Sequence, residues 1–192
     1  YALFLSPEIT IKSGFKISPG LRFVKNSVYD APPVIPSLNA KLALSKTLDL
    51  RLGYARGFRS PALRELYFNF HDASHSINGN ENLKAEYSNS FNAFLVWQAV
   101  NQPILRLNST FGTFYNVFHD LIDTGVDPNN RTQTTYINVN LFKTTGFTWD
   151  NKLFYKDLQA TLGASYIARY NEFSKTPDAG QFSYFTAHPG IT

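Results

Sequence analysis

Four residues in one polar stretch carry side chains that could bind a ligand or a metal ion: His71, Asp72, His75 and Asn78. Imidazole nitrogens and carboxylate oxygens are ligands that transition metals accept. The spacing of these residues matches no metal-binding motif, and no predicted helix aligns them on one face. The pattern therefore favours a polar loop, and we predict neither a bound metal nor a cofactor.

Catalysis has no support in the sequence. The chain has no cysteine, and it contains none of the motifs GxSxG, HExxH and GxxxxGK. Its histidines, at positions 71, 75, 119 and 188, fall in three separate regions. The formal net charge of +4 comes from Lys and Arg residues dispersed among acidic ones, which does not indicate nucleic-acid binding. We expect neither an enzyme nor a nucleic-acid-binding protein.

Apolar and polar residues alternate along most of the chain, which is the pattern of a strand with one apolar face. Leu50, Leu52 and Tyr54 share one parity, whereas Arg51 and Gly53 share the other. Similar alternation recurs over residues 38–45, 84–98, 105–117, 137–155 and 158–171. No segment has apolar residues sustained at helical spacing. The sequence predicts an all-β chain of about eight or nine strands in an antiparallel up-and-down meander.

The predicted connections alternate between short and long. Residues 46–47, 101–103 and 156–157 form compact turns, whereas residues 60–83, 122–134 and 172–181 form longer polar loops. Within the first loop, residues 64–67 are expected to form a short helical turn with Ser60 as its N-cap. Turns at one rim and loops at the other are typical of outer-membrane barrels, which also carry aromatic girdles. The seventeen Phe, eleven Tyr and two Trp residues fit that arrangement.

Two motifs resemble the barrel of TonB-dependent outer-membrane receptors. They are RGFRSPALRELYF from Arg56 and INGNENLKAEYSNS from Ile77, and the run YINVNLFKTTGF from Tyr136 resembles a further strand of that family. Ala85 stands where the family usually has proline. The resemblance implies a location in the bacterial outer membrane and a C-terminal barrel portion without the plug. We expect residues 1–192 to form a single β-barrel segment that is truncated at both ends, because such receptors have about 22 strands.

The resemblance also implies a function in transport. The complete receptor would import a scarce ligand, such as a ferric siderophore, cobalamin or a glycan. Its expected partners are outer-membrane lipid, the missing plug and the rest of the barrel, a TonB-type energy-coupling protein acting through the plug, and a small-molecule or metal-chelate ligand. Inward-facing residues and outer loops would contact that ligand, and the candidates are Arg51, Arg59, His71, Asp72, His75, Asn78 and Arg106.

Two alternatives remain open from the sequence. A soluble β-sandwich or a lipocalin-like binding module would have the same periodicity, with its apolar parity facing another sheet or an interior instead of lipid. A set of eight strands could also close into a small barrel, whereas an open arc would leave two unpaired edges.

Overall fold

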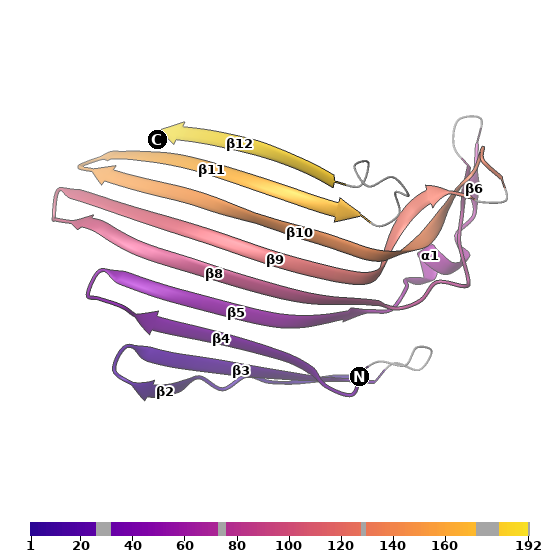
Figure 1. The fold of residues 1–192 in the computed structure, drawn as a ribbon, viewed down its shortest axis with the longest axis horizontal. Coiled ribbons are helices and arrows are strands. Elements are labelled where there is room, and N and C mark those ends of the chain that lie inside the picture. Colours follow the sequence, from indigo (N-terminus) through magenta and orange to yellow (C-terminus); the bar gives the residue numbers. More distant parts are fainter. Residues whose placement is uncertain (26–31, 73–75, 128–129, 172–180, 192) are drawn as a thin grey trace.

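The computed structural model describes residues 1–25, 32–72, 76–127, 130–171 and 181–191. Strands dominate this part of the chain, and nine of them form one continuous antiparallel path (Figure 1). In spatial order the path consists of β1 (Ala2–Leu5), β3 (Phe15–Val24), β4 (Ile35–Ala43), β5 (Leu48–Arg59), β8 (Glu86–Asn101), β9 (Leu105–Val126), β10 (Thr134–Tyr155), β11 (Leu158–Asn171) and β12 (Gln181–Ile191). The predicted all-β meander is therefore confirmed.

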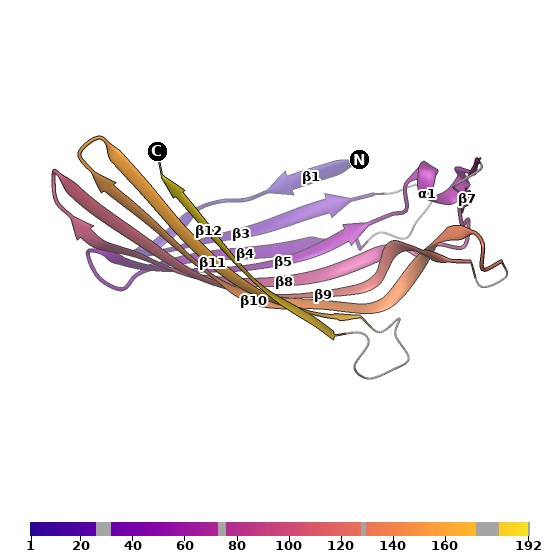
Figure 2. The same cartoon turned by 90° about the horizontal axis from the view of Figure 1, so that it is seen from above.

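The sheet is an open arc. Its strand order begins at β1 and ends at β12, and these two strands do not pair with each other. The sheet is strongly curved, and β1 and the C-terminal end of β12 lie on the same side of it (Figure 2). Of the two arrangements that the sequence left open, the structure has the arc.

One face of the sheet is apolar and exposed. Leu52 on β5, Phe91 on β8 and Phe147 on β10 keep 47%, 48% and 56% of their surface accessible. Their neighbours in sequence point to the other face, which carries polar and small side chains. Because no second sheet covers the apolar face in the described part of the chain, this is not a sandwich. We call the two sides the apolar face and the polar face.

The first strand of the sheet is interrupted. β1 and β2 (Ile9–Lys12) both pair with β3, and Ser6, Pro7 and Glu8 separate them. Proline has no backbone N–H to donate, so within sheets it is tolerated at edges and bulges. The interruption brings Glu8 close to β3, where its carboxylate accepts a hydrogen bond from Lys16 at 2.7 Å.

β9 and β10 extend further than the sequence predicts. Each has 22 residues, whereas a tilted strand crosses the hydrocarbon region in roughly 9–11 residues. The loop expected at 122–134 is therefore wrong at both ends, because β9 continues to Val126 and β10 begins at Thr134. Outside lipid a strand no longer needs one apolar face. The alternation of apolar and polar residues is therefore lost there, although β9 and β10 continue to pair. The expected loop at 172–181 lies outside the described residues, apart from Gln181, which begins β12.

The segment after β5 contains a short helix and two short strands: α1 (Leu63–Tyr67), β6 (Phe70–His71) and β7 (Ser76–Asn78). The expected helical turn is confirmed, but its N-cap is Ala62 instead of Ser60. Alanine has no side-chain acceptor, and the carboxylate of Glu65 accepts from the Ala62 amide at 2.7 Å. No described helix is long and apolar enough to cross a membrane.

Candidate functional site

An ion-paired cluster anchors the long segment at the point where it leaves β5. Nη1 of Arg59 donates to both carboxylate oxygens of Glu65 at 2.9 Å, and Nη2 donates to Oε2 of Glu86 at 3.1 Å. The same Glu86 oxygen accepts from the Ile122 amide on β9 at 3.2 Å. Partial burial opposes the charged form of Arg59, but its bonds and charge contacts with the two carboxylates prevail and raise its pKa. Together, Arg59 and Glu86 therefore link β5, α1, β8 and β9.

A small apolar core lies beneath this segment. Three side chains are buried together here: Leu66 of α1, Ile122 of β9, and Leu83, which precedes β8. Tyr136 of β10 packs against them. Gly79 passes so close to α1 that a Cβ there would lie 2.5 Å from the Leu66 carbonyl oxygen. The segment is thus packed against the outward extensions of β9 and β10 instead of projecting freely into solvent.

Asparagine side chains fix the same segment to the long strands. The Asn138 side chain accepts from the Lys84 amide at 2.8 Å and donates to the carbonyl oxygens of Lys84 and Asp120 at 3.1 and 2.8 Å. Nδ2 of Asn80 donates to the Tyr136 carbonyl oxygen at 2.8 Å. These side chains replace strand pairing where the backbone turns away, so the segment has a defined shape against which a ligand could dock.

The loop residues predicted to bind ligand lie in or beside this segment. His71 on β6 is exposed, and its Nδ1 lies 2.7 Å from Oγ of Ser76. Asp72 is the exposed residue after it. Asn78 is half-buried and donates to the Gln133 side chain at 3.0 Å, before the start of β10. His75 lies outside the described residues. Within the described part of the chain, no three His, Cys, Asp or Glu side chains are grouped as a metal site would require.

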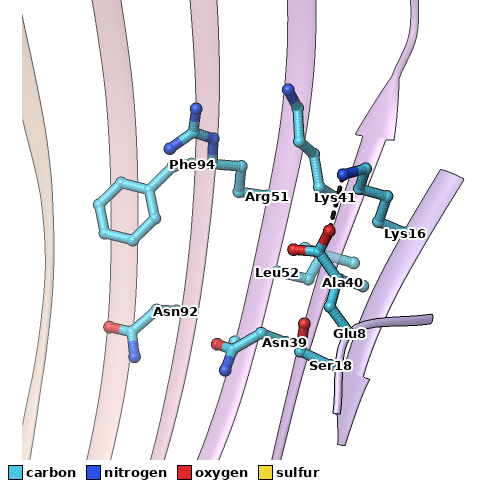
Figure 3. Close-up of a pocket in the computed structure, with 11 residues that line it drawn as sticks. Glu8, Lys16, Ser18, Asn39, Ala40, Lys41, Arg51, Leu52, Asn92 and Phe94 are labelled. Carbon is cyan, nitrogen blue, oxygen red and sulfur yellow. Dashed lines mark hydrogen bonds and ion pairs between the residues drawn. The ribbon is translucent and has the colours of Figure 1, made fainter. Parts of the chain in front are cut away.

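A second candidate site is a pocket on the polar face, at the end of the sheet formed by β2–β5 (Figure 3). Lys16, Lys41 and Arg51 are in register on β3, β4 and β5, so three cations lie side by side across neighbouring strands. Like charges placed opposite each other repel. Two ion pairs reduce this repulsion. Nζ of Lys16 lies 2.7 Å from Oε1 of Glu8, and Nζ of Lys41 lies 2.9 Å from Oδ2 of Asp49.

Arg51 is the remaining cation of this row. It is exposed, and no described carboxylate pairs with it. Asn39, Asn92 and Phe94 complete the lining of the pocket, which has a volume of about 710 Å³. Its walls therefore offer one unneutralised positive charge, amide groups and an aromatic ring.

Arg106 lies in neither of these two places. It is on the polar face near the compact turn before β9, where its guanidinium stacks 5.0 Å above the ring of Phe154. The structure thus places the predicted residues in three separate regions. These are the segment of residues 60–85 between β5 and β8 with the adjoining Arg59, the pocket at Arg51, and the rim of turns. We call residues 60–85 the outer segment.

Comparisons with known proteins agree with this geometry. A profile described as "TonB dependent receptor-like, beta-barrel" matches residues 1–188. The chain belongs to the TonB-dependent receptor β-barrel family. Barrels of this family lie in the bacterial outer membrane, so the apolar face of the chain is the lipid face, and its polar face is the lumen face. The rim of compact turns is the periplasmic rim.

The chain is also similar to individual receptors. It is 38% identical over 95 residues to the hemoglobin and hemoglobin-haptoglobin-binding proteins B and C of Haemophilus influenzae, a match that covers 48% of this chain and 9% of theirs. Among solved structures it resembles the siderophore receptor PirA of Acinetobacter baumannii, with a TM-score of 0.70 and 19% identity over 99% of this chain and 30% of that one. It also resembles the siderophore receptor PirA of Pseudomonas aeruginosa, with a TM-score of 0.63 and 17% identity over 100% of this chain and 46% of that one.

Some residues of this TonB-dependent receptor barrel escaped the sequence analysis. Lys16 was missed because the interruption at Pro7 disturbs the alternation around it. Asn138 resembled any other polar strand residue, and its role depends on contacts with residues 54 positions earlier in the chain. Asn80 had a local signal, since it follows Gly79 in a turn-like sequence, but that signal indicates turn geometry and not its bond to β10.

Proposed function

We propose that the receptor containing this chain imports an anionic, iron-carrying ligand, either a ferric chelate or heme. The observation that carries the proposal is the row of Lys16, Lys41 and Arg51 on the lumen face, which keeps a positive charge after two local ion pairs. Lumen charge selects ligands by sign. Ferric catecholates are anionic and heme carries two propionate carboxylates, whereas a neutral glycan would gain nothing from this row.

The names of related proteins support the same ligand class. The Haemophilus influenzae relatives are hemoglobin-binding proteins, and the structural neighbours are siderophore receptors. Cobalamin, a ligand considered from the sequence, has no counterpart in these names. In the proposed mechanism the outer segment with His71, Asp72, His75 and Asn78 makes the first contact with the ligand. The ligand then passes the cationic row, and a plug outside this chain gates the path under the control of a TonB-type energy-coupling protein.

Growth under iron limitation tests this proposal. Cells that lack the receptor gene would be complemented with the wild-type gene, Arg51→Gln or Lys152→Gln, and supplied with hemin, hemoglobin or a ferric catecholate as the iron source. Lys152 is a matched control because it is another lumen-face cation, in register with Asn108 and Thr161.

We expect one of the iron sources to require the receptor, and Arg51→Gln to reduce uptake from that source about fivefold, the effect of losing roughly 1 kcal/mol of charge attraction. Lys152→Gln should stay near wild type. Uptake of cobalamin or a neutral glycan with no effect on iron use would refute the proposal.

A further inference from the structure

The lipid face carries a groove of about 430 Å³ that crosses β4, β5, β8 and β9. Each of these strands has a hydrogen-bonded neighbour on both sides, so the groove does not depend on the open edges of the sheet. Ala93 and Thr113, in register on β8 and β9, form part of its floor. Tyr54 and Phe91 flank it with rings 5.0 Å apart. The groove is predominantly apolar and has the dimensions of a small-molecule site.

Two hydrogen-bond donors lie just beyond the outward end of this groove, one residue pair past Tyr54 and Phe91 on the same face of β5 and β8. Arg56 follows Tyr54 by two residues on the same face and is in register with Asn89. The Tyr54 hydroxyl donates to Oδ1 of Asn89 at 2.9 Å, so the amide nitrogen of Asn89 remains as a donor beside Arg56. Arg56 is exposed, and among the described residues its guanidinium has no hydrogen-bond or ion-pair partner. A charged group on the lipid face is costly in hydrocarbon, and it needs a polar partner.

The position of Arg56 along β5 places it near the headgroups of the outer leaflet. It lies eight residues after Leu48, the first residue of β5. At about 3.4 Å per residue and a tilt of about 40°, this separation raises Arg56 roughly 20 Å above the periplasmic rim. The apolar band of such barrels is about 25 Å tall, and a long arginine side chain extends its charge to the nearest interface. The groove runs from that level toward the membrane centre.

We propose that this region is a binding site for a phosphorylated lipid of the outer leaflet. The phosphate binds Arg56 and the amide of Asn89, and one acyl chain lies in the groove over Ala93 and Thr113. A planar guanidinium matches phosphate oxygens in geometry and in charge. An apolar protein partner would leave both donors unsatisfied, whereas lipid A, the phosphorylated lipid that we assign to this site, places an anion above an acyl chain in the orientation that the groove requires. The site is independent of the imported ligand.

The test compares two lipids that differ only in phosphate. The full-length receptor that contains this chain, purified in detergent, would be titrated with bis-phosphorylated lipid A or with the same lipid after dephosphorylation, and bound lipid counted by native mass spectrometry. The variants are Arg56→Gln, Arg56→Lys and Ala93→Phe, which fills the groove. The controls are Lys143→Gln, a lipid-face cation already held 5.8 Å from the Tyr170 ring, and Ala164→Phe on β11, outside the groove.

We expect the wild-type receptor to bind the phosphorylated lipid about tenfold more tightly than the dephosphorylated one. Arg56→Gln should abolish this preference, Arg56→Lys should keep part of it, and Ala93→Phe should weaken the binding of both lipids. Both controls should match the wild type. Equal binding of the two lipids by the wild type, or equal effects of Arg56→Gln and Lys143→Gln, would overturn the proposal. Heat-modifiable gel mobility verifies that every variant is folded.

Discussion

Replacing Glu86 should open the outer segment locally without unfolding the barrel. One carboxylate oxygen of Glu86 accepts from Nη2 of Arg59 at 3.1 Å and from the Ile122 amide at 3.2 Å. The Glu86 side chain is only 14% exposed, whereas that of Arg59 is 42% exposed. A hydrogen bond to a charged group contributes about 1.5–3 kcal/mol, and solvent screening at Arg59 lowers the share of the ion pair.

The two substitutions Glu86→Ala and Glu86→Gln separate the contributions. Alanine removes both bonds, and because Arg59 keeps its two bonds to Glu65, we expect a loss of about 2 kcal/mol. Glutamine keeps an acceptor for the Ile122 amide and loses only the charge, so we expect about 1 kcal/mol. These losses correspond to increases of about 30-fold and fivefold in the local opening constant.

Hydrogen exchange in the full-length receptor measures that constant directly. The amide of Ile122 and those of residues 76–86 should exchange faster by these factors, whereas the central part of β9 should be unchanged. Glu81→Ala is the matched control, because Glu81 is an exposed carboxylate of the same segment. If the Ile122 amide in Glu86→Ala exchanges within twofold of the wild type, the ion-paired cluster does not hold the segment in place.

Three further substitutions test other parts of the architecture. Gly79→Ala places a Cβ 2.5 Å from the Leu66 carbonyl oxygen, so limited proteolysis of the outer segment on intact cells should become about tenfold faster; unchanged cleavage would contradict the close packing. Asn138→Ala removes three hydrogen bonds to backbone atoms. We expect it to destabilise the same segment by about 2 kcal/mol, as measured by hydrogen exchange. A loss below about 0.5 kcal/mol, which is about a twofold change in exchange rate, would show that water replaces these bonds. Phe147→Lys should cost about 2 kcal/mol in urea-driven unfolding from lipid vesicles, while Thr148→Lys on the lumen face should cost little, and equal costs would mean that the two faces are wrongly assigned.

The strands and their faces were readable from the sequence because lipid imposes a strict period of two. Leu52 and Arg51 were assigned to opposite faces on that basis, and the structure places both within the continuous strand β5, where adjacent side chains point to opposite faces. The same rule stops working beyond the membrane, where β9 and β10 continue in water. The last residues of β9 and the first residue of β10 were therefore predicted to be loop.

The candidate site was predictable only in part, because its contacts join residues far apart in the chain. Arg59 was expected on the lumen face as a ligand contact, whereas the structure engages it with Glu65 and Glu86. The cationic row depends on the register of three strands, which the alternation of a single strand does not specify. Parity predicts the face of a residue, but its neighbours across the sheet follow from pairing.

The single-layer wall described above separates two kinds of selection on the sequence. In a protein with an interior core, a change at a binding surface is transmitted through packed side chains to the opposite surface. Here residues 51 and 52 are adjacent on β5 yet face different media, with the lumen on one side and lipid on the other. The lumen can thus acquire a new ligand preference while the fit to the membrane stays intact, so one barrel design can be adapted to many cargoes.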